Sequence, residues 1–289
     1  MAPAVHGQAE RLSPAIDVGF IGLGNLGAPV ARRIAGAGYP LTVWARRAET
    51  LAAVTDLPAR VASSARDLAA SSDLVCLCVR TDHDVCTVMD GADGVLAGAR
   101  PGTIVAIHST VDPETCRRLA DEAAGINVTV IDAPLSGGHP AAEQGELLVM
   151  TGGDAAAAER CRPLFETFGS LVLHMGPIGT AQRAKLVNNT LLTANIGLAA
   201  DAIELGRALD IDPDMLARAL QHGTGRSYGL GLFVRTQQDG LMTAAGWGLV
   251  RKDVDLLVDA ASRAGADGHT LVEPAERYLD QSRPEGAEP

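Results

Sequence analysis

Short apolar runs alternate with amphipathic segments over roughly the first 176 residues of the chain. The runs predict strands at Ile16–Ile21, Leu41–Trp44, Leu74–Val79, Thr103–Ile107, Val128–Asp132, Leu147–Thr151 and Leu171–His174. Segments with helical spacing lie between them, at Ala28–Gly36, Pro113–Ala124 and Ala155–Thr167. Continuous apolar strands that alternate with helices are typical of a parallel sheet covered by helices on both faces. The pattern therefore predicts an α/β Rossmann-like domain with a parallel sheet.

The pattern changes at Gly176–Gly179, and no strand is predicted after it. Ala181–Leu209 is rich in alanine and leucine and predicts one long helix, and Asp212 before Pro213 indicates the start of another. A further helix is predicted at Lys252–Arg263. We expect an α/β domain at residues 16–176, an all-α domain at 177–283, and flexible tails at 1–15 and 284–289.

Composition narrows the possible functions. The net charge is -11, whereas proteins that bind nucleic acids or membranes are usually basic, so neither partner is expected. Five cysteines without a C-x-x-C pair predict free thiols in a reducing, cytoplasmic compartment. The first 15 residues lack the continuous apolar region of a signal peptide, and no stretch approaches the roughly 20 apolar residues of a membrane span. The seven histidines lack ligand spacing, so no metal site is expected.

A glycine triplet directly follows the first predicted strand and opens a helix. Gly22 permits a tight turn, Gly24 lets a pyrophosphate approach the backbone, and Gly27 lets helix and strand pack closely. The N-terminus of the helix offers free N–H groups and the positive end of its dipole to the phosphates. We therefore expect a dinucleotide to bind along the whole loop, which comprises Gly22, Leu23, Gly24, Asn25, Leu26 and Gly27.

The end of the second predicted strand bears on the choice of dinucleotide. An NAD site usually has Asp or Glu about 20 residues after the glycines, to bind the ribose hydroxyls. This chain has Arg46 and Arg47 there, and no carboxylate before Glu49. Because guanidinium groups bind phosphate bidentately, the pair predicts NADP as the cofactor, with NAD as the other possibility.

Five motifs in order resemble the β-hydroxyacid dehydrogenase family, which includes 3-hydroxyisobutyrate dehydrogenases and tartronate semialdehyde reductases. The resemblance extends from about Ile16 to about Leu279. The motifs are GFIGLGNLG (Gly19–Gly27), HSTVDPET (His108–Thr115), IDAPLSGG (Ile131–Gly138), GPIGTAQRAKLVNN (Gly176–Asn189) and RKDVDL (Arg251–Leu256).

Three polar residues of the fourth motif share one face of the predicted long helix. Lys185, Asn188 and Asn189 are spaced i, i+3 and i+4. A lysine there can donate a proton to the alkoxide that develops as hydride reaches a carbonyl, and can accept it back in the reverse reaction. The resemblance implies that Lys185 is the catalytic acid/base and that Asn189 assists it.

The resemblance also implies where substrate and cofactor bind. Ser136, Gly137 and Gly138 offer a hydroxyl and unobstructed N–H groups, and the family holds the substrate carboxylate with this segment. Thr110 and Lys252 match cofactor-side residues of the family. Arg226, in the stretch His222–Leu230, is a candidate for substrate selection.

Two departures from the family pattern leave the substrate open. Ile107 takes the place of an aspartate that the family often has before its Ser-Thr motif, and His108, which we interpret as structural, precedes Ser109. Arg80 directly follows the third predicted strand, Leu74–Val79. Its side chain either contacts a phosphate or carboxylate or points outward.

The leading hypothesis is an NADP-dependent oxidoreductase that interconverts a small β-hydroxy acid and its semialdehyde. One alternative is an NADPH-dependent imine reductase, against which Lys185 argues, because those enzymes usually have another residue there. The other is a dinucleotide-sensing protein without catalysis, which would be expected to have lost that lysine. The small side chains of the long helix predict a homodimer or homotetramer.

Overall fold

One sheet of nine strands organises the N-terminal part of the computed structural model, which describes residues 16–239 and 244–284. The tails predicted at 1–15 and 284–289 lie outside the described residues, apart from residue 284. The strands are β1 (Val18–Ile21), β2 (Leu41–Trp44), β3 (Ala59–Val61), β4 (Leu74–Leu77), β5 (Ile104–Ile107), β6 (Thr129–Asp132), β7 (Leu135–Ser136), β8 (Leu147–Gly152) and β9 (Gly169–Gly176).

The parallel part of the sheet has the strand order β3-β2-β1-β4-β5-β6. The chain therefore crosses to the other side of β1 when it enters β4, so the strand order reverses between the carboxyl ends of these two strands. In open α/β sheets this is where ligands bind. The predicted glycine loop follows β1 and lies at this position.

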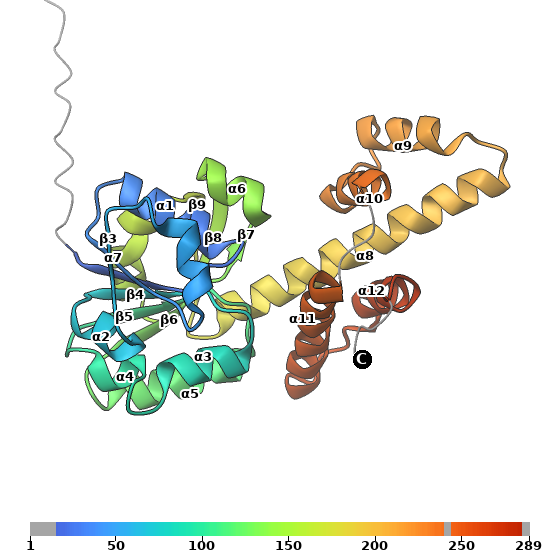
Figure 1. Cartoon of the computed structure of the whole chain (residues 1–289). Coiled ribbons are helices and arrows are strands. Elements are labelled where there is room, and N and C mark those ends of the chain that lie inside the picture. Colours follow the sequence, from blue (N-terminus) through green and yellow to red (C-terminus); the bar gives the residue numbers. More distant parts are fainter. Residues whose placement is uncertain (1–15, 240–243, 285–289) are drawn as a thin grey trace, which may run out of the picture.

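Helices cover both faces of the sheet, as the alternation predicted (Figure 1). Side chains of α1 and α7 join one buried core, around Phe20, Phe165 and Phe168, and side chains of α2, α3 and α5 join the other, around Ile21 and Leu119. The helices of this part are α1 (Gly27–Gly36), α2 (Ala65–Ala70), α3 (Asp82–Met89), α4 (Val95–Gly98), α5 (Pro113–Ala124), α6 (Gly138–Gln144), α7 (Ala155–Phe165) and the 3-10 helix η1 (Ala48–Val54).

The last strands depart from a purely parallel sheet. β8 pairs antiparallel with β6 and β7, and β9 then pairs parallel with β8. Between β6 and β8 the chain forms only the two-residue β7 and the seven-residue α6, and a parallel return needs a longer crossover. β7 continues the pairing of β6 along β8, so the segment Ser136–Gly138 lies just beyond the end of β6, where the chain turns back.

A helix of 29 residues, α8 (Thr180–Ala208), leads out of the α/β part and carries the rest of the chain (Figure 1). Within the described residues only helices follow it: α9 (Pro213–His222), α10 (Tyr228–Asp239), α11 (Ala244–Arg263) and α12 (His269–Gln281). α9 and α10 lie along the far half of α8, α11 lies along its near half, and α12 lies along its middle, where Tyr278 contacts Gly197 (Figure 1). The helix predicted at Lys252–Arg263 thus begins eight residues earlier, where glycines hide the periodicity.

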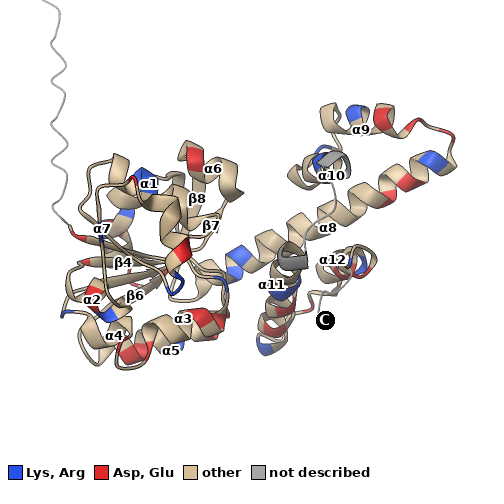
Figure 2. Cartoon of the chain, viewed as in Figure 1, with Lys and Arg blue, Asp and Glu red and all other residues tan. Residues whose placement is uncertain are grey.

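Charge is spread over both parts of the molecule, but the middle of α8 has none. Residues 186–200 contain no Asp, Glu, Lys or Arg, and Figure 2 shows this stretch of α8 in tan. None of the described helices is both long and apolar enough to cross a membrane. The uncharged stretch begins one residue after Lys185.

Candidate active site

The glycine loop has the geometry of a phosphate cradle. Gly22 has a φ of 101°, and a Cβ there would overlap the carbonyl oxygen of Cys78 on the neighbouring β4 loop. A Cβ at Gly27 would overlap the carbonyl oxygen of Gly22, whereas Gly24 faces open space. No side chain caps the first turn of α1, so the positive end of the helix dipole faces the loop without a carboxylate or hydroxyl in front of it. The loop therefore fits a dinucleotide pyrophosphate.

The two arginines after β2 lie at the surface. Arg46 forms an ion pair of 3.0 Å with Asp84, in the first turn of α3. Arg47 is 3.8 Å from Glu49, and both side chains are exposed. Both guanidinium groups are accessible, but a phosphate would have to replace Asp84 as the partner of Arg46.

A chain of polar contacts joins the loop after β5 to α11 and α8. Lys252 donates to the carbonyl oxygen of Thr110 at 2.5 Å and lies 2.8 Å from Oδ1 of Asp253. The other carboxylate oxygen of Asp253 accepts from Nδ2 of Asn189 at 2.6 Å. Asp253 is buried, so its charge is compensated by these donors rather than by water.

The same contacts continue to the loop Ser136–Gly138. Asn188 donates to Oδ1 of Asn189 at 3.1 Å and to the hydroxyl of Ser136 at 3.4 Å. Gly137 and Gly138 have φ values of 132° and 73°, which side-chain-bearing residues rarely adopt. The predicted substrate loop is thus in contact with the face of α8 that carries Asn188 and Asn189.

Lys185 lies one turn before these asparagines and is 8% exposed. Burial lowers its pKa from 10.5 to about 8; the nearby charge of Asp253 raises that pKa and that of Lys252 lowers it. Among the residues that the structure describes, none forms a hydrogen bond or ion pair with its ammonium group. The amine is therefore close to half protonated near pH 8 and is free to exchange a proton with a bound molecule.

Comparison with known proteins covers nearly the whole chain. Residues 17–176 match the family model of the NAD binding domain of 6-phosphogluconate dehydrogenase, and residues 179–286 match that of the NAD-binding region of NADP-dependent 3-hydroxyisobutyrate dehydrogenase. The chain is 34% identical to human mitochondrial 3-hydroxyisobutyrate dehydrogenase, over 85% of this chain and 75% of the human one. The chain belongs to the β-hydroxyacid dehydrogenase family.

Two further relatives show the range of this dehydrogenase family. An NAD-dependent L-serine dehydrogenase of Pseudomonas aeruginosa is 36% identical, over 75% of this chain and 73% of that protein. The structure of a 3-hydroxyisobutyrate dehydrogenase of Mycobacterium tuberculosis with L-serine has a TM-score of 0.81 and 27% identity, and covers 92% of this chain and 93% of that one. The protein is thus an NAD(P)-dependent dehydrogenase that acts on CH–OH groups.

Three residues considered in the sequence lie outside this dehydrogenase's cluster of polar contacts. Arg226 is exposed on the loop between α9 and α10, and α10 begins against α8 near Asn195, well beyond Lys185. Its part in substrate selection stays a prediction. Arg80 is exposed after β4. His108 is buried against Phe165 and Phe168 and bonds the Ala133 carbonyl at 2.8 Å.

Burial also decides the protonation state of His108. It lowers the pKa of this histidine from 6.5 to about 4, so the imidazole is neutral near pH 7. A neutral ring enclosed by aromatic side chains has no acidic proton to give to a substrate at that pH. This supports the interpretation of His108 as a structural residue.

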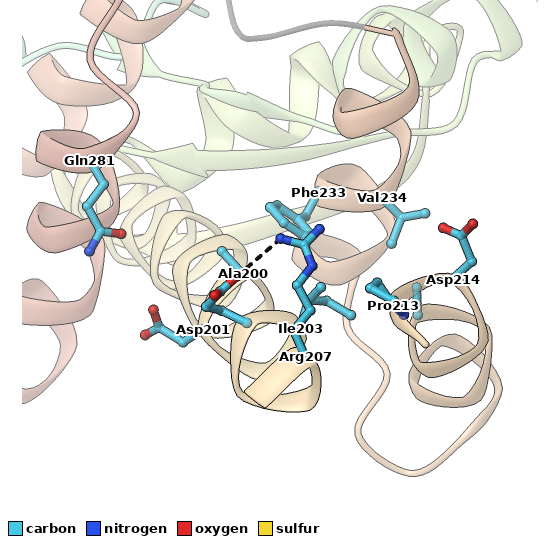
Figure 3. A pocket seen from close by; sticks show the side chains of 11 residues that line it. Ala200, Asp201, Ile203, Arg207, Pro213, Asp214, Phe233, Val234 and Gln281 are labelled. Carbon is cyan, nitrogen blue, oxygen red and sulfur yellow. Dashed lines mark hydrogen bonds and ion pairs between the residues drawn. The ribbon is translucent and has the colours of Figure 1, made fainter. Parts of the chain in front are cut away.

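A separate cavity of about 530 Å³ lies between α8, α9 and α10 (Figure 3). It is lined by the apolar side chains of Ile203 and Phe233 and by the carboxylates of Asp201, Asp214 and Glu204, the last paired with Arg207 at 3.1 Å. It contains none of the residues predicted for catalysis or cofactor binding. The cavity is therefore separate from the cluster of polar contacts around Lys185.

Two buried residues escaped the sequence analysis because their role depends on packing. Asp132 ends β6 and accepts hydrogen bonds from the first turn of α8, 47 residues later. Gln182 lies three residues before Lys185 and forms hydrogen bonds with the loop after β5. Only the charge of Asp132 at the end of an apolar run could have indicated a special role.

Proposed function

We propose that the chain is an NADP-dependent oxidoreductase that interconverts a small β-hydroxy acid and its semialdehyde, with Lys185 as general acid/base. The main support is the burial of Lys185 beside Asp253 and Asn189, where its pKa is about 8. Residues 16–176 are assigned to cofactor binding, and residues 177–283 to substrate binding and oligomerisation. The five free cysteines support a cytoplasmic location.

The bound dinucleotide supplies or accepts the hydride, and the chain controls the proton. In reduction the Lys185 ammonium donates a proton to the oxygen that gains negative charge, and in oxidation the neutral amine removes the hydroxyl proton. Asn189, held by Asp253, orients that oxygen. Ser136 and the N–H groups of Gly137 and Gly138 bind the substrate carboxylate. Thr110 and Lys252 contact the bound cofactor.

The reaction is tested by nicotinamide absorbance with a panel of substrates. Reduction is assayed with NADPH and four candidates: methylmalonate, tartronate and succinate semialdehydes and glyoxylate. Oxidation is assayed with NADP⁺ and 3-hydroxyisobutyrate or L-serine, because relatives are named for these two compounds. Turnover of one acid supports the proposal. Turnover of a cyclic imine alone would instead indicate an imine reductase, and tight NADPH binding without any turnover would indicate a dinucleotide sensor.

The cofactor preference gives a direct prediction for Arg46. The Arg46→Gln substitution removes a guanidinium that we propose binds the 2′-phosphate, so we expect the Kd for NADP to rise about tenfold. The Kd for NAD, which lacks that phosphate, should stay within about twofold and serves as the control in the same variant. Isothermal titration measures both. A wild-type Kd for NAD equal to or below that for NADP would contradict the preference.

The exposed face of α8 supports a homodimer. Leu191, Leu198 and Leu205 recur every seven residues and are 49%, 50% and 62% exposed, with Val187 one turn before them. They form an apolar stripe about 27 Å long from Val187 to Leu205. A second copy can cover it by placing the same stripe against it around a two-fold axis. We infer a homodimer, or a tetramer built from such dimers.

Charged residues in the stripe should separate the copies. We expect the wild type to show at least twice its chain mass of 29.8 kDa in light scattering at micromolar concentration, and the Leu198→Glu/Leu205→Glu variant to show the mass of a single chain. Ile126→Glu changes an exposed apolar residue away from α8, with an exposed fraction of 41%, and should leave the mass unchanged. A monomeric wild type would refute the inference.

A further inference from the structure

The N-terminus of α8 is capped by a residue from another part of the fold. Gly179, at the N-cap position, has no side chain to satisfy the free N–H groups of the first turn. Asp132, at the end of β6, does so instead. Its Oδ1 accepts from the N–H of Gly179 at 2.8 Å, and its Oδ2 accepts from the N–H of Gln182 at 2.9 Å.

The site of Asp132 is built around its carboxylate. Asp132 is fully buried, and a Cβ at Gly152, its partner in the β6–β8 pairing, would overlap Oδ1. Burial raises the pKa of Asp132, while the N–H donors of α8 oppose that rise. A carboxylate at a helix N-terminus also interacts favourably with the positive end of the helix dipole. The carboxylate is therefore held by the N–H groups of α8 on one side and confined by the backbone of Gly152 on the other.

Gln182 ties the same turn of α8 to the loop after β5. Its side chain is fully buried; Nε2 donates to the carbonyl oxygen of Ser109 at 2.8 Å, and Oε1 accepts from the N–H of Val111 at 3.2 Å. These hydrogen bonds hold Ser109 and Val111, the two neighbours of Thr110. The carbonyl oxygen of Thr110 in turn accepts a hydrogen bond from Lys252. The first turn of α8 is thus bonded to the end of β6 and to the cofactor-side loop.

Lys185 lies three residues after Gln182, which is less than one turn of α8. A rigid helix transmits the position of its first turn to the next, a rise of about 4.5 Å from residue 182 to 185. Asp132 also stands four residues before Ser136, in the segment that is proposed to bind the substrate. One side chain therefore links the proton donor to the substrate loop.

We propose that Asp132 is a positioning residue for the dehydrogenase reaction: it holds the first turns of α8, and hence Lys185, in register with the Ser136 loop and with Thr110. It need not touch substrate or cofactor. The proposal rests on the role proposed above for Lys185. Because proton transfer requires the donor within hydrogen-bond reach, a displacement of about 1 Å is enough to slow the reaction strongly.

The decisive variant is Asp132→Asn, which keeps the shape of the side chain. The amide has only one oxygen, so its NH₂ group must face an N–H donor of α8, and the turn should shift. We expect kcat to fall about tenfold with the Kd for NADPH within about twofold of the wild type. The apparent pKa in the pH profile of kcat should also move, because Lys185 shifts relative to Asp253.

A second variant and a control separate positioning from general loss of structure. Gly152→Ala keeps the charge of Asp132 but displaces its carboxylate, and should reproduce the lower kcat even if Asp132→Asn does not fold. Asp154→Asn removes another carboxylate cap, on α7, which accepts from the N–H of Ala157 at 2.7 Å. That variant should retain kcat and the wild-type pH profile.

The outcomes distinguish this proposal from the proposed function. Unchanged kcat and pH profile in both Asp132→Asn and Gly152→Ala, with Lys185→Met inactive, would overturn the positioning role alone. A decrease in activity that only follows the folded fraction, with the wild-type pH profile, would overturn it as well. Full activity of Lys185→Met would instead overturn the function on which the proposal rests.

Discussion

Replacing Lys185 with methionine is expected to lower kcat for reduction by about 10³-fold, within the range that general acid catalysis usually contributes. Methionine has a similar length and suits the buried surroundings of this side chain, so the protein should fold. The Kd for NADPH should change little, because the glycine loop and the arginines are untouched. Stopped-flow or steady-state absorbance measures kcat, and fluorescence titration measures the Kd.

Arg183→Met is the matched control for this prediction. Arg183 is a cation on the same helix, two residues before Lys185, but its side chain is exposed. Its removal changes the net charge by the same amount as the loss of a charged Lys185. We expect wild-type kcat in this control. A Lys185→Met enzyme with more than about a tenth of wild-type kcat would mean that another group supplies the proton.

The second large effect is expected for Asp253→Asn. The carboxylate pairs with Lys252 and Asn189, and its charge raises the pKa of Lys185, which burial otherwise lowers. Without that charge, the pKa of Lys185 should fall below its present value of about 8. We expect kcat for reduction at pH 8 to fall by about 10- to 100-fold, because less of the amine is protonated and Asn189 loses its anchor.

The pH profile gives this prediction its direction. In the wild type, reduction should decline as the pH rises through about 8, and oxidation should increase over the same interval. In Asp253→Asn the decline of reduction and the rise of oxidation should both occur at lower pH. Asp255→Asn, an exposed carboxylate on the same helix that pairs with Arg251 at 3.0 Å, should leave both in place. An Asp253→Asn profile that coincides with the wild type would show that Asp253 does not control Lys185.

Much of the fold could be predicted because it is encoded locally. The strand Leu41–Trp44 and the helix Pro113–Ala124 have the predicted bounds, and α9 begins at Pro213 after the Asp212 cap. In each case the periodicity or the cap lies within the element itself. The reversal at β8 and the short strands β3 and β7 could not be predicted, because a strand of two or three residues is defined by its partner and not by its own pattern.

The candidate site divides in the same way. The glycine loop and the shared face of Lys185, Asn188 and Asn189 follow from spacing along one strand–turn–helix or one helix. The contacts of Asn189 with Asp253, and of Lys252 with Thr110, join residues 64 and 142 positions apart. No spacing rule reaches that far, so the sequence could name these residues only through a family resemblance.

The sequence by itself determined the class of the protein: a dinucleotide loop on an α/β sheet, a helical second part, and a lysine on a polar helix face. These follow from periodicity and from glycine positions, which act over a few residues. Only the tertiary structure decided that Lys185 is buried next to Asp253, which sets its charge state, and that Asp132 caps α8 from another element. Burial and electrostatic shifts depend on which distant groups pack together, and a local pattern does not contain that information.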